Sequence, residues 1–377
     1  MGDDKNRRER LKTGFKVFCG ASAFAALGCS DGQIKETTAA KYEKSEKKQY
    51  RWKMVTTWPK NFPGLGTGAN KLANYIETLS DGQISLKVYG ASELVPALGV
   101  FDAVQRGSVQ MGHGAAYYWQ GKHPATSFFG SVPFGLNAHE MNAWLYYGGG
   151  LELWHKLYAP FGLMSFPAGN TGVQMGGWFN KKIKTPEDFK GLKVRMPGLG
   201  GSVLSRLGAT VVTLSGGDIF QALKTNNIDG SEWVGPYNDL ASGLHKAAKY
   251  YYTPGWHEPG TAIEALINRE AFKTLPSHLQ ETVKIACIAA NQDMMSEYTF
   301  KNAQSFEDIK NDKNIKIMHF SDEILRQLHK TSEDVVKELS KHDEISKEIY
   351  NSFKKFKKMS MSWDLVSENS FSLARQL

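Results

Sequence analysis

The chain has 377 residues, of which 41% are hydrophobic, and a formal net charge of +8. This length can bury a sizeable core and favours two domains over one. The positive charge is divided between the first residues and scattered lysines, without the basic and aromatic cluster of a nucleic-acid-binding module, so we expect no nucleic acid as a partner. Three cysteines (Cys19, Cys29 and Cys287) are too few for a disulfide framework.

Residues 1–28 have the pattern of an export signal. A basic start leads into a run of small residues ending at Gly28, which is shorter than the roughly 20 residues of a membrane-spanning helix. The pair Arg7-Arg8 resembles a twin-arginine signal, and the ordinary secretory route stays open beside it. Cys29 follows the run as in a lipoprotein cleavage site, so lipidation and simple cleavage are both open. Residues 29–49 are polar and charged, which predicts a flexible tether.

Strand and helix patterns alternate after the tether. This succession predicts an α/β domain with a mostly parallel sheet, in which ligands bind beyond the carboxyl ends of the strands. Three consecutive aromatic residues, Tyr117 to Trp119, come directly after the third strand. They fit a packed wall, and we expect Tyr118 to face a ligand. The elements are strands at Tyr50–Thr57, Ile84–Tyr89 and Val109–His113, with helices at Ala69–Leu79 and Val100–Gln105.

The stretch Asn170–Pro197 holds two apolar runs, Val173–Phe179 and Leu192–Met196, that predict short buried strands. Each run contains one polar residue that a core strand would avoid, Gln174 in the first and Arg195 in the second. A buried guanidinium without a partner is costly, so Arg195 needs an anion beside it. Its planar fork suits a small carboxylate held by two parallel hydrogen bonds, and a structural ion pair is the alternative.

A third polar point lies at Glu232-Trp233, at the end of another predicted strand. An amide oxygen, a carboxylate and an arginine brought together would bind a small anion, with a hard cation beside it. The histidines near strand ends, His113 and His257, lack the short spacing of a zinc site, and His257 fits a hinge lining or an ordinary loop. The sequence suggests no nucleophile and base pair, so we expect no catalytic residues.

Three segments resemble the substrate-binding proteins of tripartite ATP-independent periplasmic (TRAP) transporters: Gly169–Phe179, Lys190–Gly198 and Glu232–Asp239. The similar branch binds 2-oxo or 2-hydroxy monocarboxylates together with a metal ion, and the resemblance runs in order from about Tyr50 almost to the C-terminus. It implies an α/β, two-lobed periplasmic binding protein with hinge-crossing strands and long C-terminal helices. Such a receptor would deliver its ligand to the TRAP membrane permease subunits.

The resemblance also implies roles for individual residues. Arg195 matches the family's ligand anchor. The Gln174 and Glu232 side chains and the Trp233 backbone carbonyl would hold Na⁺ or Ca²⁺, and the ligand's own oxygens would complete the shell. One departure is that Ser215 and Asp218 flank two glycines where the family usually has proline and glutamate. The expected ligand contacts are Arg195, Gln174, Trp233, Tyr118 and Asn170.

We expect lobe I to comprise residues 50–166 and 251–320, and lobe II residues 167–250. Lys249–Thr253 and Ala262–Asn268 are predicted as strands that return the chain to lobe I. The helices of residues 321–377 would pack on lobe I or exchange with a second protomer to form a homodimer. Two alternative functions stay open: a periplasmic metal-assisted enzyme on the same scaffold, and a ligand-binding module for a sensor.

Overall fold

The structure is a computed structural model that describes residues 48–377. The predicted export signal, Cys29 and all but the end of the predicted tether lie outside these residues. Within the described part of the chain, none of the helices combines the length and the apolar character that crossing a membrane requires.

Five strands form sheet A, in the order β2-β1-β3-β10-β4. The parallel pairing of β1 with β2 and with β3 confirms the start of the domain that the strand and helix alternation predicted. The strand β10 runs antiparallel between β3 and β4, and it is apolar almost throughout because it has a neighbour on each side. The strands are β1 (Tyr50–Thr56), β2 (Ile84–Tyr89), β3 (Met111–Gly114), β4 (Leu163–Asn170) and β10 (Ala262–Asn268).

Six shorter strands form sheet B, in the order β11-β9-β5-β8-β6-β7. The strand β5 begins at Gly177 and not at Val173, because Gln174 and Met175 donate their backbone N–H groups to the loop carbonyls of Glu258 and Val234. The segment before β5 is thereby held between two loops. The strands are β5 (Gly177–Phe179), β6 (Lys193–Arg195), β7 (Thr210–Val212), β8 (Gly230–Ser231), β9 (Tyr250–Thr253) and β11 (Lys316–His319).

Strand pairing differs from the expected division of the chain at three strands. The strand β4 belongs to sheet A, so the first part of the chain extends to Asn170 and not to residue 166. The strands β9 and β11 pair with each other, and β9 also pairs with β5, so both belong to sheet B. The chain therefore returns to sheet A with β10 alone. An apolar pattern identifies a buried strand but not its hydrogen-bonding partner, which explains the different placement of β4 and β9, whereas the short, partly exposed β11 lacks such a pattern.

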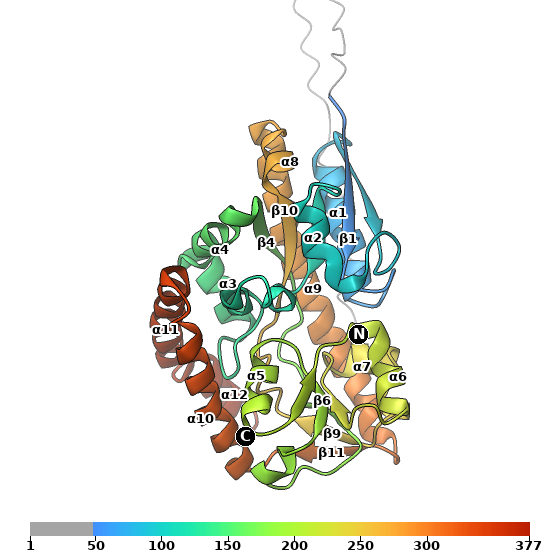
Figure 1. Ribbon diagram of the computed structural model, residues 1–377, viewed down its shortest axis with the longest axis vertical. Helices are drawn as coiled ribbons and strands as arrows, with labels where there is room; N and C mark the ends of the chain where they lie inside the picture. The colour runs from blue at the N-terminus through green and yellow to red at the C-terminus, as the bar shows by residue number, and fades with distance from the viewer. Residues whose placement is uncertain (1–47) are drawn as a thin grey trace, which may run out of the picture. The chain divides into compact units, whose positions relative to one another are not determined.

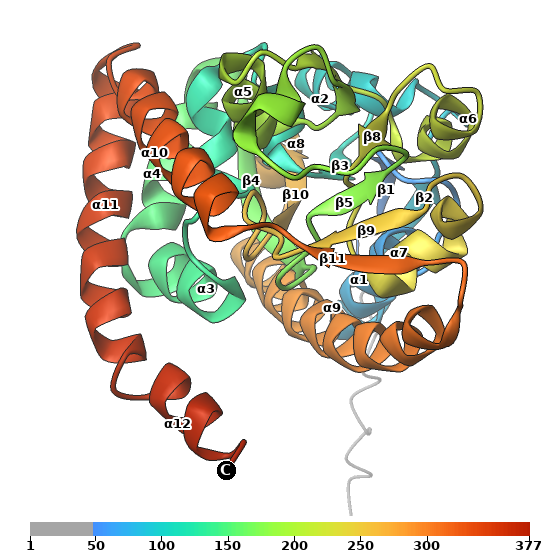
Figure 2. The same cartoon turned by 90° about the horizontal axis from the view of Figure 1, so that it is seen from below.

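The helices surround both sheets, and the long C-terminal helices confirm the expected architecture (Figure 1). Helix α9 packs against α1 and β4 on the side of sheet A and against α7 on the side of sheet B (Figure 2). The helices are α1 (Leu65–Leu79), α2 (Val100–Gln105), α3 (Ala138–Tyr147), α4 (Gly150–Tyr158), α5 (Gly198–Arg206), α6 (Ile219–Lys224), α7 (Pro236–Ala241), α8 (Arg269–Lys273), α9 (Ser277–Asn311), α10 (Asp322–Leu339), α11 (Glu344–Asp364) and α12 (Glu368–Ala374).

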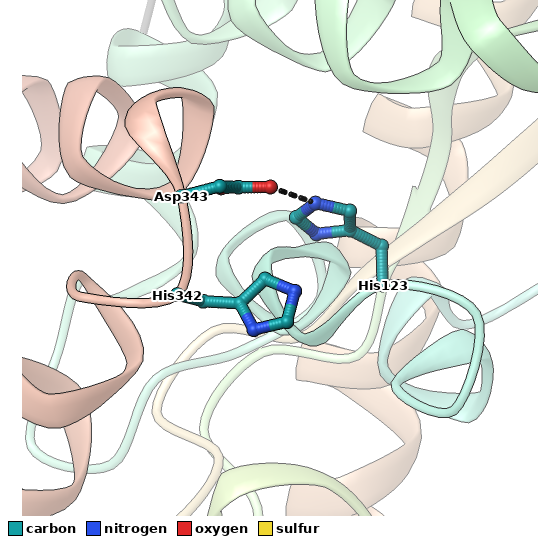
Figure 3. A group of neighbouring side chains, drawn as sticks. All are labelled: His123, His342 and Asp343. Atoms are coloured by element: carbon teal, nitrogen blue, oxygen red, sulfur yellow. Dashed lines mark hydrogen bonds and ion pairs between the residues drawn. The ribbon is translucent and has the colours of Figure 1, made fainter.

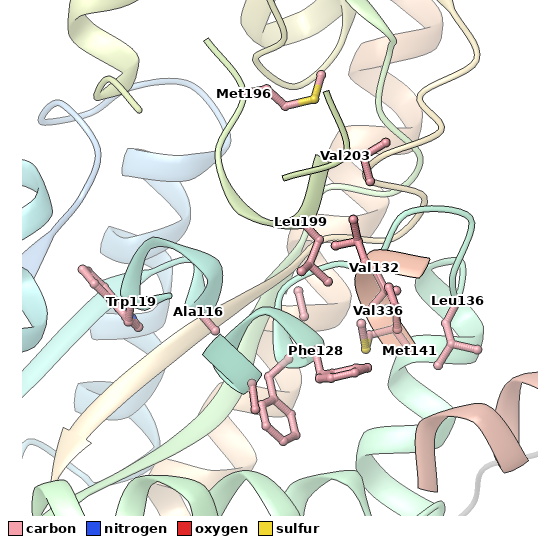
Figure 4. Packing of buried hydrophobic residues seen from close by; sticks show 14 of the residues in the cluster. Ala116, Trp119, Phe128, Val132, Leu136, Met141, Met196, Leu199, Val203 and Val336 are labelled. Carbon is pink, nitrogen blue, oxygen red and sulfur yellow. The ribbon is translucent and has the colours of Figure 1, made fainter. Parts of the chain in front are cut away.

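One apolar cluster connects the segment after β3 with the C-terminal helices. Figure 4 shows Trp119 and Phe128 from the first region, Leu199 and Val203 from α5, and Val336 from α10. Close packing of this kind fixes side-chain positions, because a void or a clash costs free energy. The short 3-10 helix η2 (Ala116–Trp119), which carries the predicted aromatic wall, is therefore seated on a packed core.

Candidate functional site

Arg195 ends β6 and its side chain is only 1% exposed. Its Nη1 donates to a carboxylate oxygen of Glu232 and, at 3.1 Å, to the Glu232 backbone carbonyl. Its Nε donates to the Leu214 carbonyl at 3.2 Å. The strands β6 and β8 are parallel neighbours with Arg195 opposite Ser231, so Glu232 comes directly beside the guanidinium. The buried cation thus has the buried anion that the sequence required, and this anion belongs to the chain itself.

The other terminal nitrogen of Arg195, Nη2, lies 3.4 Å from the Tyr118 hydroxyl. Tyr118 reaches it from η2, on the side of sheet A. Burial raises the pKa of Tyr118 to about 12, so the hydroxyl is neutral and can donate a hydrogen bond. The Trp233 ring completes the surroundings, with its centroid 5.4 Å from the Arg195 Cζ. The structure thus brings Arg195, Tyr118, Glu232 and Trp233 together.

Gln174 is buried and its amide is oriented by two threonines. Its Nε2 donates to Thr171 Oγ1 at 3.1 Å and to Thr261 Oγ1 at 3.2 Å. Its Oε1 has no hydrogen-bond partner among the described residues, and the same holds for Glu232 Oε2. A buried acceptor without a donor costs about 1–3 kcal/mol, so two of them at one site point to a group that they would bind. Both are hard oxygens, which suit Na⁺ or Ca²⁺.

Two neighbouring residues that the sequence left outside the predicted site, His257 and Glu258, lie beside Glu232. The Nε2 of His257 is 3.5 Å from Glu232 Oε2, and potential ligand atoms of all three residues lie within 4.8 Å of one another. Burial, and then the charge of Glu232, raises the pKa of Glu258 to about 7. The sequence signal was the His-Glu pair in a loop rich in glycine and proline, a pattern too common to be decisive alone.

Glu258 is connected to Gln174 through one hydroxyl group. Thr261 Oγ1 donates to Glu258 Oε2 at 2.6 Å and accepts from Gln174, while the Tyr117 hydroxyl lies 3.3 Å from the same carboxylate oxygen. Sequence reasoning did not select Tyr117 or Thr261 either. This network fixes the Gln174 amide so that its oxygen, and not its nitrogen, is left without a partner.

A small cavity of about 10 Å³, the room of roughly one water molecule, lies beside Gln174 and Thr261. Of the expected ligand contacts, Gln174, Tyr118 and Trp233 line it, whereas Arg195 does not. Asn170 is not among its lining residues: its Oδ1 accepts from the Gly172 N–H at 2.8 Å and its Nδ2 lies 3.4 Å from the Gly260 carbonyl. The lining is otherwise mostly apolar and consists of Trp58, Leu65, Tyr117, Tyr118, Thr171, Gln174, Trp233, Val234, Thr261 and Ile263.

The loop that carries Glu232 and Trp233 is held from both sides. Behind it, Asp239 accepts from the Val234 N–H at 3.2 Å, from Trp178 Nε1 at 3.0 Å and from the Tyr251 hydroxyl at 2.7 Å. On the side of the Trp233 ring, Gly216 lies so close that a Cβ added to it would be 2.1 Å from the ring. The glycine is thus required by close approach, although the residues flanking the two glycines depart from the family pattern.

Comparison with known proteins identifies the class of protein to which this chain belongs. Residues 54–343 match the family described as bacterial extracellular solute-binding protein, family 7 (DctP). The chain belongs to this family, whose members are the periplasmic receptors of TRAP transport systems, and the resemblance seen in the sequence is thereby confirmed. The family and the similar structures are binding receptors.

Three relatives illustrate the similarity. The monocarboxylate 2-oxoacid-binding periplasmic protein of Nostoc sp. is 46% identical over 321 residues, which are 85% of this chain and 88% of that protein. A TRAP periplasmic solute-binding protein from Colwellia psychrerythraea, crystallised with calcium and pyruvate, is 42% identical with a TM-score of 0.84, over 86% of this chain and 99% of that one. A third, from Pseudoalteromonas atlantica with sodium and pyruvate, is 41% identical with a TM-score of 0.84, over 86% and 98%.

Proposed function

We propose that this receptor captures a small 2-oxo or 2-hydroxy monocarboxylate together with Na⁺ or Ca²⁺ and delivers it to TRAP membrane permease subunits. The observation that carries the proposal is the buried Arg195 guanidinium paired with Glu232, whose other oxygen, Oε2, lacks a hydrogen-bond partner among the described residues, as does Gln174 Oε1. A cation at these oxygens and an anion at Arg195 would satisfy all three groups. The ligands named for the relatives, pyruvate and 2-oxoacids, have this chemistry.

We assign the ligand carboxylate to Arg195 Nη2 and the Tyr118 hydroxyl, since Nη1 is already engaged by Glu232. Gln174, Glu232 and the Trp233 carbonyl would hold the cation, and we add Glu258 to this predicted set. Trp233 and the other aromatic side chains would cover the carbon chain of the ligand. We no longer count Asn170 as a contact, because backbone groups engage both ends of its amide.

Charge balance in the site predicts a different protonation state of Glu258 for each of the two cations. With Ca²⁺, Arg195 and the ion carry three positive charges, which Glu232, Glu258 and the ligand carboxylate balance. With Na⁺, balance requires Glu258 to keep its proton. Because unbalanced buried charge is costly, the protonation of Glu258 is expected to follow the charge of the cation.

We further propose that the chain closes around the ligand as two lobes. Lobe I would consist of sheet A with helices α1 to α4, and lobe II of sheet B with α5 to α7. The connections from β4 to β5 and from β9 to β10, and helix α9, would cross between them. Tyr118 comes from lobe I and Arg195 from lobe II, so a ligand carboxylate between them would favour the closed arrangement.

The metal-assisted enzyme stays the alternative, since His257 and Glu258 supply acid–base groups beside the proposed cation ligands. Its test is incubation of the protein with candidate acids and Ca²⁺, followed by chemical analysis of the acids. We expect every acid to be recovered unchanged. A product formed by the native protein but not by a Glu258→Gln variant would favour the enzyme.

Thermal unfolding of the mature protein with a panel of small acids, with and without Na⁺ or Ca²⁺, tests the proposed function. A ligand at 100 times its dissociation constant that binds only the folded protein stabilises it by about 2.7 kcal/mol. We expect a large, cation-dependent shift of the unfolding temperature with a 2-oxo or 2-hydroxy monocarboxylate. The absence of a shift with every carboxylate would contradict the assignment of Arg195.

The C-terminal helices suggest a second copy of the chain as a partner. Helix α11 packs on α3 and α4, but large apolar side chains remain exposed beyond Lys358. We propose that they are covered in a homodimer, and a Trp363→Glu/Phe371→Glu variant that stayed dimeric by light scattering would contradict this. The exposed residues are Met359, Met361, Trp363, Leu365, Val366, Phe371, Leu373 and Leu377.

Two features of the first 29 residues bear on how the protein is exported and held at the membrane. We propose that the mature protein is held at the membrane through a lipidated Cys29. A Cys29→Ser variant should then appear in the soluble periplasmic fraction, whereas an unchanged distribution would favour simple cleavage near Gly28. Replacing Arg7-Arg8 by two lysines tests the twin-arginine route, because that exchange should block export only if the pair is read.

A further inference from the structure

Two histidines and an aspartate meet at the surface, away from the site described above (Figure 3). His123 lies between η2 and the 3-10 helix η3 (Pro124–Phe129), while His342 and Asp343 form the turn between α10 and α11. The Nε2 of His123 is 2.8 Å from Asp343 Oδ2, and the two imidazole rings are 5.3 Å apart between centroids. One potential ligand atom from each residue lies within 4.8 Å of the others.

The cluster joins parts of the chain that are far apart in sequence. Helix α10 packs against α5, and α11 packs against α4 and η3. The turn that joins α10 to α11 therefore lies between these two sets of contacts. On the opposite side, the His123 N–H donates to the carbonyl of Trp119, the last residue of η2. The three side chains therefore connect the C-terminal helices to the segment that directly follows Tyr118.

We propose that His123, His342 and Asp343 form a binding site for a divalent transition-metal ion of the Zn²⁺ type. Two imidazole nitrogens and one carboxylate oxygen are a common ligand set for this ion, and water takes the fourth position. Ligand atoms around tetrahedral Zn²⁺ lie roughly 3.3–3.5 Å apart, so the present spacing needs only small side-chain rotations. Soft and borderline metals prefer imidazole, whereas the cation site around Gln174 offers mainly oxygen ligands.

Two of the three ligands are already held in place. Asp343 caps α11, with Oδ1 accepting from the Ser346 N–H at 2.9 Å, which leaves Oδ2 for the histidine or the metal. His123 caps η3, with Nδ1 accepting from the Ala125 N–H at 3.2 Å, so its Nε2 carries the proton that faces Asp343. Metal binding at Nε2 would move this proton to Nδ1 and give up the Ala125 bond. His342 is exposed, which lets its ring turn toward the ion.

An ion at this position would clamp the C-terminal helices to the segment that follows η2. The site is built from residues outside the proposed carboxylate site, so it does not depend on the proposed function. Its occupancy is expected to change stability, because an ion that binds only the folded chain stabilises it by mass action.

Calorimetric titration of the mature chain with ZnCl₂ tests the site. We expect one Zn²⁺ per chain, with an affinity that falls at least tenfold in a His342→Ala variant and in an Asp343→Asn variant. Asparagine is also a good helix N-cap, so the second variant removes the charge while it keeps the start of α11. His278→Ala removes an exposed histidine of α9 and serves as the matched control with unchanged affinity.

A second measurement separates this site from Zn²⁺ bound near Glu232 and His257. Excess Zn²⁺ should raise the unfolding temperature of the native protein and of the His278→Ala variant. The increase should be much smaller in the His342→Ala variant. Equal Zn²⁺ affinity in the native protein and both cluster variants would overturn the proposal, since the ion would then lie elsewhere. The absence of stoichiometric binding in the native protein would overturn it as well.

Discussion

Two buried glutamates, Glu264 and Glu232, differ in how completely their carboxyl oxygens are hydrogen-bonded. Glu264, on β10, is 0% exposed and accepts hydrogen bonds from Trp119 Nε1 and Ser165 Oγ, with the Tyr158 hydroxyl 3.5 Å away. Glu232 is 1% exposed, and one oxygen pairs with Arg195 while the other, Oε2, has no hydrogen-bond partner in the described part of the chain.

This difference distinguishes a structural carboxyl group from a candidate binding group. Burial raises the pKa of Glu264 to about 7, so near neutral pH this group can keep a proton inside its complete set of hydrogen bonds. Glu232 instead pairs with the Arg195 guanidinium through one oxygen, and its other oxygen, Oε2, accepts no hydrogen bond from the described residues. A complete hydrogen-bonding shell stabilises one conformation, whereas an incomplete one leaves a place for a ligand.

Replacement of Arg195 by alanine should have the largest effect. We expect both ligand binding and stability to be lost, because the variant leaves Glu232 charged, buried and without its ion-pair partner. Breaking a buried pair costs about 3–5 kcal/mol, and denaturant unfolding would measure the loss. Arg195→Lys keeps the charge without the fork, so it should recover stability but bind the acid weakly. Full stability in Arg195→Ala would contradict the importance of the pair.

Replacement of Glu264 by alanine should destabilise the protein without affecting binding directly. The Trp119 and Ser165 donors would lose their acceptor, and each unsatisfied buried group costs about 1–3 kcal/mol. The free energy of unfolding and the carboxylate affinity should therefore separate, with a large change in the first and a small one in the second. A large loss of affinity in a variant that still folds would place Glu264 among the groups that position the ligand site.

Gly216→Ala should disturb the site through the Trp233 ring, which a new Cβ would approach to 2.1 Å. Overpacking of this kind costs about 1–3 kcal/mol, and we expect a loss of carboxylate affinity of about tenfold. Gly217→Ala is the matched control, since a Cβ there meets only Pro59 Cγ at 4.0 Å. Isothermal titration of both variants tests the prediction, and equal affinities would show that the ring position is not critical.

Replacement of Glu232 by glutamine should act mainly through the cation. The variant keeps the shape of the side chain but removes its charge, so we expect binding in the presence of Ca²⁺ to weaken more than binding without added cation. Titration with the acid under the two conditions measures this difference. Equal losses would argue against Glu232 as a cation ligand.

The smallest effect should be a dependence of binding on pH. Burial, and then the charge of Glu232, raises the pKa of Glu258 in the folded protein to about 7, from an ordinary value of 4.5. Between these pH values the folded state holds a proton that the unfolded state has lost, so this group makes the protein less stable as pH rises toward 7. Binding of Ca²⁺ favours the ionised group, so Ca²⁺-supported affinity should increase with pH up to about 7 and then level off.

A Glu258→Gln variant is the control for this pH dependence, and its Ca²⁺-supported affinity should vary much less with pH. Binding supported by Na⁺ should also depend less on pH, because charge balance lets Glu258 keep its proton there. A pH profile that is the same in Glu258→Gln and in the native protein would assign the titration to another group. Titration calorimetry at several pH values would supply all these profiles.

Sequence patterns predicted most of the secondary structure and several residues of the candidate site. Strand and helix periodicity located β1, β2, β3 and β10, and single polar residues in apolar runs selected Gln174 and Arg195. The position of Glu232-Trp233 at a strand end selected these two residues, the resemblance implied their role toward a cation, and the structure brings both to the arginine. Periodicity could not assign β9 to sheet B, because an apolar strand has the same pattern whichever neighbour it pairs with, and it did not reveal the short, partly exposed strand β11.

The amino-acid pattern alone was enough to indicate the family and the need of Arg195 for an anion, because these depend on local sequence and on the chemistry of single side chains. The folded chain was needed to show which anion Arg195 meets and which polar atoms of the described residues lack hydrogen-bond partners. It also added Glu258, His257 and Thr261 to the site and showed Asn170 engaged elsewhere. These outcomes depend on contacts between residues far apart along the chain, as between Arg195 and Glu232 at a separation of 37 and between Gln174 and Thr261 at a separation of 87. Such distances are set by packing and not by spacing along the chain.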